Sequence, residues 1–203
     1  MVRGRPREHN PQTLLNHARS LWVEKGTAGL TIRALSDRAG VGNGVIYNAF
    51  GSRSNLLAQV WIREADAFLD YQRDLVDTAV RDRGAQAGVL AAALSLRSYA
   101  STNEEAARLL LAVEAKDLIS TDLGAGEGSE VVRLRAELGR LITGLADELW
   151  GRTDPRAVAL VKICVVDLPG KLLLSANRLD SGLAQHALRE AVRGITAAEP
   201  PPT

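Results

Sequence analysis

The sequence predicts an all-α protein in which an N-terminal helix-turn-helix domain precedes a larger helical domain. Apolar residues recur at steps of three and four along most of the 203 residues, which is the spacing of a helix that packs on one face. Strictly alternating patterns, which predict strands, are scarce. Short clusters of Gly, Pro, Asn and Asp separate the helical stretches and mark the turns.

The two predicted domains differ in charge, although the whole chain carries only +1. Residues 1–53 hold eight basic and three acidic side chains, a net charge of +5, whereas residues 54–203 hold 17 basic and 21 acidic side chains. A basic segment joined to an acidic one is typical of a nucleic-acid-binding domain attached to a domain of another kind. The charge difference thus favours a nucleic-acid-binding domain at 1–53, with a flexible basic arm at 1–10, and a second domain at 54–203.

Residues 11–40 contain two predicted helices. The first ends near Gly26, and its buried face is expected to consist of Leu14, Leu15, Ala18, Leu21 and Trp22. The second begins after Thr31, whose hydroxyl can accept a hydrogen bond from the first turn, and it ends at Gly40. Its inner face is expected to consist of Ile32, Leu35 and Ala39.

A third helix, predicted at about 43–50, completes a helix-turn-helix. Such a motif needs a small residue where its helices touch, a turn residue with positive φ, and apolar residues that hold the second helix down. Ser36 and Gly40 meet the first two needs, and Val41, Val45 and Ile46 meet the third. The side chains expected to face solvent are Asn43, Asn48, Ala49 and, at the edge, Tyr47. Asparagine can read adenine with two hydrogen bonds, and tyrosine suits a phosphate contact.

The remainder of the chain is predicted to be helical as well. Ser52 caps a long fourth helix, and further helices are expected at about 85–100, 104–119, 129–150, 154–177 and 182–197. The segment TDLGAGEGS is expected to be a loop. Pro169 and Gly170 should kink or interrupt the helix at 154–177, and the tail EPPPT should be disordered.

The run from Leu14 to Val60 resembles the DNA-binding domain of the TetR family of regulators. The resemblance rests on an ordered set of positions: Trp22, Gly26 with Thr31, the turn Ala39–Val41, Tyr47 with Phe50, and the step Phe50–Arg53. The set covers roughly a quarter of the chain. The rest is similar to the family only in length and helical character.

The resemblance implies phosphate contacts by Tyr47 and Arg53 and by the first turn of the second helix. The expected DNA contacts of the motif are Thr31, Arg33, Asn43, Gly44, Tyr47, Asn48 and Arg53. Three residues depart from the family pattern, namely Gly42, Val45 and Ala49, and their identities remove a helix cap and a possible phosphate contact. Because residues 39–52 carry no charge, the electrostatic attraction to DNA must come from Arg33, Arg38, Arg53 and the arm.

The arm sequence RGRPR at 3–7 has two interpretations. Arg3 and Arg5, next to Pro6 that keeps the chain extended, suit insertion into a narrow A·T minor groove. The alternative is a solvated basic tail with no defined contact.

The resemblance also implies a pocket for a small-molecule effector in the second domain. The candidate ligand contacts are Trp61, Phe68, Tyr71, Arg97, Trp150 and Asp167, although each aromatic residue is more often plain core. Arg97 and Asp167 interrupt apolar stretches and would need a partner if they were buried. In order of preference they pair with each other, face a dimer interface, or meet a ligand.

Taken together, the resemblance implies a sequence-specific regulator, usually a repressor, that binds a palindromic double-stranded DNA operator as a homodimer. The last two helices, at 154–177 and 182–197, would form a four-helix bundle with their twofold mates and place the recognition helices about 34 Å apart. An effector would favour a state in which the fourth helix has moved and this spacing no longer fits. The alternative is a small-molecule binding protein whose helix-turn-helix no longer reads DNA.

No catalytic, cofactor or metal site is expected. The chain lacks GxSxG, P-loop, HExxH and CxxC motifs, and His9, His17 and His186 have no metal-ligand spacing. Cys164 fits a small buried hydrophobe. No uncharged run approaches the roughly 20 residues that cross a bilayer, and no apolar segment follows the basic N-terminus, so we expect a cytoplasmic protein without membrane contact.

Overall fold

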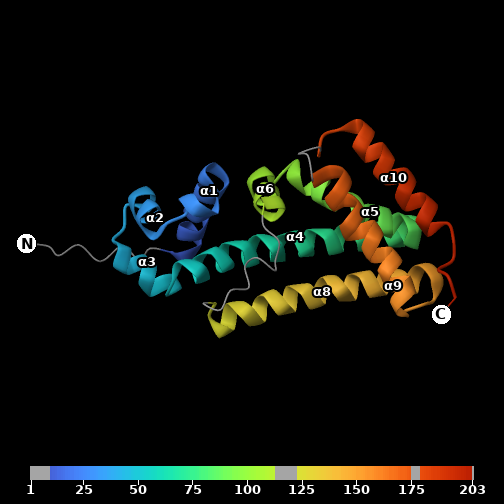
Figure 1. Ribbon diagram of the computed structural model, residues 1–203, viewed down its shortest axis with the longest axis horizontal. Coiled ribbons are helices and arrows are strands. Elements are labelled where there is room, and N and C mark those ends of the chain that lie inside the picture. The colour runs from blue at the N-terminus through green and yellow to red at the C-terminus, as the bar shows by residue number, and fades with distance from the viewer. Residues whose placement is uncertain (1–9, 113–122, 175–178, 203) are drawn as a thin grey trace, which may run out of the picture. The chain divides into compact units, whose positions relative to one another are not determined.

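The computed structural model describes residues 10–112, 123–174 and 179–202, which form helices and their connections without any strand (Figure 1). The predicted all-α class is confirmed. The chain divides into two compact units: Met1–Glu64 with Arg108–Val131, and Ala65–Ala107 with Val132–Thr203. One unbroken helix, α4 (Arg53–Arg83), supplies residues to both units. None of the described helices is long and apolar enough to span a bilayer.

The first helix, α1 (Pro11–Gly29), starts where Asn10 accepts a hydrogen bond from the N–H of Gln12 at 2.9 Å. All five residues of its predicted inner face are buried. The predicted stop at Gly26 takes the form of a kink, since this glycine has φ 69° and the helical turns continue to Gly29. Only glycine adopts such a left-handed backbone without steric cost.

The second helix, α2 (Ile32–Ala39), has the caps that the sequence predicts. The hydroxyl of Thr31 accepts from the N–H of Ala34 at 3.0 Å, a cap that contributes about 1 kcal/mol. Gly40 ends the helix with φ 66°, and its N–H donates to the carbonyl of Ser36. The third helix, α3 (Asn43–Phe50), has the predicted bounds.

The chain after α4 forms helices of both units. They are α5 (Ala85–Ala100), α6 (Glu104–Ala112), α8 (Ala125–Trp150), α9 (Pro155–Lys162), the π-helical segments Ile163–Asp167 and Gly170–Leu174, and α10 (Gly182–Thr196). The helix predicted at 104–119 is described only as far as Ala112, because 113–122 lie outside the described residues.

The start of α8 corrects a prediction, because the helix begins at Ala125 rather than 129 and so includes the last five residues, AGEGS, of the predicted loop TDLGAGEGS. Tertiary contacts with α4 explain the difference. The side-chain oxygen of Asn55 accepts from the N–H of Gly124 at 2.9 Å, and Gln59 donates to Glu127 at 2.8 Å. Glu127 also lies in the first turn, where a negative charge interacts favourably with the helix dipole.

The helix predicted at 154–177 changes its hydrogen-bonding pattern where the sequence places Pro169. Asp154 caps α9 by accepting from the N–H groups of Arg156 and Ala157. The two π-helical segments lie on either side of Leu168 and Pro169. Proline lacks an N–H and its ring crowds the preceding turn, so the wider π-helical turns accommodate it. The predicted interruption is confirmed, whereas residues 175–178 lie outside the described residues.

The C-terminal tail, predicted to be disordered, is instead held in place as far as it is described. Arg152 donates to the carbonyls of Pro200 at 2.9 Å and Pro201 at 3.2 Å, and Pro200 is buried. The same guanidinium pairs with Asp154, and this hydrogen bond is the main reason that the pKa of Asp154 is lowered. The contact was not predictable because the tail and Arg152 lie far apart in the sequence.

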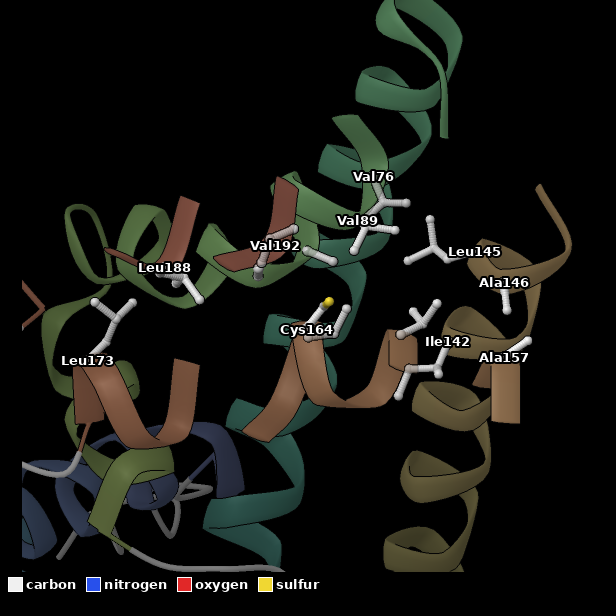
Figure 2. Close-up of a cluster of buried hydrophobic side chains, with 14 of the residues drawn as sticks. Val76, Val89, Ile142, Leu145, Ala146, Ala157, Cys164, Leu173, Leu188 and Val192 are labelled. Carbon is white, nitrogen blue, oxygen red and sulfur yellow. The ribbon is translucent and has the colours of Figure 1, made fainter. Parts of the chain in front are cut away.

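The core of the second unit contains Cys164, which lies among apolar side chains of α4, α5, α8 and α10 (Figure 2). Its side chain is fully buried, and desolvation raises the pKa of the thiol to about 11. The cysteine is therefore a neutral, small hydrophobe at physiological pH, as the sequence predicts.

A glycine on α5 allows the close approach of neighbouring helices in this core. A Cβ atom on Gly88 would lie 2.4 Å from a methyl of Val80 and 3.1 Å from a methyl of Leu145. Val80 belongs to α4 and Leu145 to α8, and both pack in the same cluster. The position therefore requires a residue without a side chain.

We expect Gly88→Ala to destabilise the protein by about 1–3 kcal/mol, because the added methyl overpacks the core. Gly144→Ala on α8 is the matched control, since a Cβ atom there meets nothing within 4 Å and alanine favours the helix. Urea unfolding followed by circular dichroism measures both changes. Equal or greater stability of the Gly88 variant would contradict the packing described here.

Candidate nucleic-acid interface

The orientation of α3 is fixed by two buried side chains and by the turn before it. Ile46 is fully buried and Phe50 is 3% exposed, and their spacing of four places them on one face. In the turn, the hydroxyl of Ser36 donates to the carbonyl of Val41, whose side chain is also buried. Ser36 and Val41 thus hold the turn as the sequence predicts.

The opposite face of α3 is open to solvent. The exposed residues are Asn43, Gly44, Val45, Tyr47, Asn48 and Ala49. Tyr47 is 53% exposed, which is high for so large an aromatic side chain. The side-chain amides of Asn43 and Asn48 lie on this face, where they are accessible to a ligand such as a base edge.

Val45 does not anchor α3, which corrects the prediction made from its apolar character. Its side chain is 38% exposed. In a helix each residue turns by about 100°, so Val45 points away from the face that Ile46 and Phe50 share. Anchoring therefore falls to the pair spaced at i and i+4.

The first turn of α2 exposes Thr31 and Arg33. The hydroxyl oxygen of Thr31 accepts the capping hydrogen bond from Ala34, and the residue itself is exposed. The first N–H groups of a helix have no partner within the helix, so they too can bind a ligand here. Arg33 makes no ion pair among the described residues, so its charge is available to a phosphate.

The other two arginines of the motif are engaged within the protein. Both carboxylate oxygens of Glu24 accept from Arg38 at 2.8 Å, so the charge of Arg38 is balanced. Arg53 donates through Nε to the carbonyl of Leu30 at 2.7 Å and through a terminal nitrogen to the carbonyl of Thr27. Arg53 therefore ties the start of α4 to the end of α1, and its phosphate contact stays a prediction.

The arm residues Arg3 and Arg5 lie outside the described residues, so the choice between minor-groove insertion and a solvated tail stays open. Among the residues that the structure does describe, no group of His, Cys, Asp and Glu could hold a metal ion.

The candidate ligand contacts fall into separate surroundings. Phe68 and Tyr71 pack around Tyr99, with ring centroids 5.5 Å and 5.3 Å from it. Trp150 packs instead against the core cluster of Figure 2. Trp61 is 8% exposed and belongs to the first unit, where its indole N–H has no hydrogen-bond partner in the described part of the chain.

Arg97 and Asp167 are both exposed, so neither needs the partner that burial would have required. Within the described ranges no ion pair joins them, which corrects the preferred interpretation. Each residue lies on a helix that buries apolar residues on another face. The spacing of those apolar residues did not show whether Arg97 and Asp167 themselves are buried.

Sequence reasoning missed three polar side chains of the first unit that make contacts distant in the sequence. Glu24, Asn55 and Gln59 act on groups 14, 69 and 68 residues away in the chain. The sequence carries no signal for such contacts, because each depends on which polar side chains the packing of helices brings together.

The comparisons with known proteins agree with this geometry. Residues 14–60 match the family described as bacterial regulatory proteins, tetR family. The matched segment contains α2, α3, the turn between them and the start of α4. No curated protein sequence matches the chain.

Solved structures share the fold over most of the chain. The regulator FadR from Bacillus subtilis, in complex with stearoyl-CoA, is 12% identical with a TM-score of 0.67, covering 93% of this chain and 98% of that one. The TetR family regulator PfmR from Thermus thermophilus is 14% identical with a TM-score of 0.61, covering 91% and 97%. The superantigen PfiT is 19% identical with a TM-score of 0.67, covering 91% and 95%, so the fold alone does not determine the function.

The function follows instead from the matched segment and its exposed recognition helix. Over residues 14–60 the chain therefore matches the DNA-binding segment of the tetR family of bacterial regulatory proteins, and the rest of it shares its fold with solved TetR-family regulators.

Proposed function

We propose that this regulator is a repressor that binds a palindromic operator as a homodimer and is released by a small molecule. The observation that carries the proposal is α3, whose buried pair Ile46 and Phe50 leaves Asn43, Tyr47 and Asn48 directed at solvent. A helix that exposes polar side chains on a rigid support fits the major groove.

Within each half-site, Asn43 and Asn48 read base edges, and Tyr47 and Arg33 bind phosphates. Thr31 and Gly44 add contacts from exposed helix starts, where backbone N–H groups attract phosphate oxygens. Arg3 and Arg5 of the arm supply further charge, in the adjacent minor groove. Residues 1–53 act as the DNA-binding domain and 54–203 as the ligand-binding and dimerisation domain.

The homodimer forms through 154–177 and 182–197. Small exposed residues such as Ala159 on α9 and Ala187 on α10 allow the helices of two protomers to approach closely. The two recognition helices then lie about 34 Å apart and enter successive major grooves.

Support for an effector comes from an unsatisfied acceptor beside the aromatic residues. Gln72 is 3% exposed, and its amide donates to the hydroxyl of Ser95 at 2.8 Å and the carbonyl of Ala92 at 3.2 Å. Its own oxygen accepts no hydrogen bond from the described residues. A ligand that carries a donor would satisfy this oxygen, and Phe68 and Tyr71 on the same helix would contact its apolar part.

Release requires that the effector favour a different position of α4. This helix is unbroken from Arg53 to Arg83 and carries both Arg53 and Gln72. In this mechanism α4 is the element that the effector would displace, and Arg53 at its start contacts the end of α1.

We expect Asn43→Ala and Asn48→Ala each to relax the preference at one base pair by about 1–3 kcal/mol. Tyr47→Ala should weaken binding to all sequences alike, since a phosphate contact carries no sequence information. Fluorescence anisotropy on a duplex selected from a random pool, compared with scrambled DNA over a salt series, measures these effects. The exposed Thr78→Ala on α4 is the control.

If no duplex is selected by the protein at low salt, the DNA-reading proposal fails, and the chain acts as a ligand-binding protein alone. A binding constant that does not fall with added salt would also contradict it, because phosphate contacts release counterions.

Arg53→Ala should lower the free energy of unfolding by about 1–3 kcal/mol, because two backbone carbonyls lose their donor. Arg33→Ala should leave stability unchanged and reduce only DNA affinity. Urea unfolding and the anisotropy titration separate the two roles. Unchanged stability of the Arg53 variant would restore a purely phosphate-binding role.

Ala159→Glu combined with Ala187→Glu should yield a monomer, because the two glutamates place negative charges of both protomers together at the proposed interface. Both residues are exposed in the single chain, so the variant should fold. Operator affinity should fall by roughly 10²–10⁴, the loss expected when two half-sites no longer bind together. Light scattering and anisotropy measure the two changes. A monomer that still binds tightly would refute the dimeric mechanism.

A further inference from the structure

The second unit exposes a large apolar side chain at the start of α10. Leu183 is 78% exposed, the highest value of any large apolar residue that the structure describes. Asp180, three residues earlier, is also exposed and makes no ion pair among the described residues. At this point the surface therefore offers one apolar and one negatively charged side chain for a contact.

A groove of about 510 Å³ lies on the same unit between α8 and α9. Ala136, with a methyl group, and Gly139, without a side chain, occupy little of the groove. Ile142 and Val158 give it an apolar lining. Arg140 and Lys162 add two positive charges. Arg140 lies 3.8 Å from Glu137, whereas Lys162 makes no ion pair within the described ranges.

The groove and Leu183 lie toward opposite ends of the segment 155–183, which runs from the start of α9 to the start of α10. Ile142, which lines the groove, lies at one end of the core cluster together with Ala157, and Leu173 and Leu188 lie at the other (Figure 2). Leu188 is on α10, whose first residues are fixed by the hydrogen bond from Gln185 to the carbonyl of Leu179 at 2.8 Å.

A twofold axis perpendicular to the segment 155–183 would make the two copies of this segment antiparallel. In such an interface residue i of one copy contacts j of the other, and j contacts i. The end of this segment in one protomer, which carries Asp180 and Leu183, then meets the start of the same segment in the partner, which borders the groove. The chain thus carries both halves of one self-complementary contact.

We propose that Leu183 of each protomer enters the groove between α8 and α9 of its partner, and that Asp180 pairs with the partner's Lys162 and the partner's Arg140. The contact rests on the homodimer proposed above and extends it onto α8, which lies outside 154–177 and 182–197. An apolar side chain fills an apolar hollow, and a negative charge meets two positive ones, so both surfaces are satisfied at once.

Charge exchange tests the pairing. Asp180→Lys places like charges together at both copies of the contact, and so does the double variant Arg140→Glu with Lys162→Glu. We expect each variant to weaken its homodimer about tenfold or more. All three side chains are exposed, so the variants should fold, which thermal melting checks.

Mixing the two variants gives the decisive result. In a heterodimer, the Asp180→Lys side chain of one protomer meets a groove that carries both glutamate substitutions. At the second copy of the contact, the unchanged Asp180 meets the unchanged Arg140 and Lys162. Native mass spectrometry of an equimolar mixture should therefore show more heterodimer than random exchange gives.

Filling the groove tests the apolar half of the contact. Gly139→Trp places a large side chain where the partner's Leu183 would lie, so it should weaken the homodimer. Thr78→Trp on α4 is the control, since it adds the same side chain at an exposed position outside the contact. Analytical ultracentrifugation over a concentration series measures both dissociation constants.

The outcomes separate this contact from the dimer itself. A wild-type dimer that neither charge variant weakens, or a mixture at the random ratio, overturns the contact and leaves the homodimer in place. A dimer unaffected by Gly139→Trp overturns it as well, since the groove is then not occupied by the partner. A wild-type protein that stays monomeric at all concentrations overturns the homodimer and the contact together.

Discussion

The burial of Ile46 and Phe50 is the interaction on which the DNA-binding unit depends. A helix of eight residues, the length of α3, is not stable alone in water. Full burial of two such side chains contributes about 1.5–3 kcal/mol each, enough to hold the helix in one orientation. Gly40 and the hydrogen bond from Ser36 then fix the angle at which α3 leaves α2.

The charges around the motif are divided between structure and binding. Arg38 is balanced by Glu24, and Arg53 is bound to the carbonyls of Leu30 and Thr27. Arg33 is exposed and makes no ion pair among the described residues. A guanidinium that satisfies backbone carbonyls at the end of α1 prevents unpaired buried groups there, which stabilises the unit but reduces its attraction for DNA.

The second unit combines a well-packed core with surfaces that one copy leaves open. Cys164 and its neighbours fill the centre, and the glycine at position 88 allows α4 and α8 to approach α5. Within the described part of the chain no residue covers Leu183 or fills the groove next to Lys162. In the proposed homodimer a second copy of the chain covers both.

Local chemistry allowed the sequence alone to predict the helical class, the caps at Thr31 and Gly40, the bounds of α3 and the exposure of its asparagines. Helix period, capping residues and turn glycines act within a few residues of one another, so they can be read without a structure. The sequence misplaced Val45, the start of α8 and the tail at Pro200, and it left the exposure of Arg97 and Asp167 undecided. The tertiary structure decided these points, because each depends on a contact with a residue distant in the chain or on the face that a helix turns toward its neighbours.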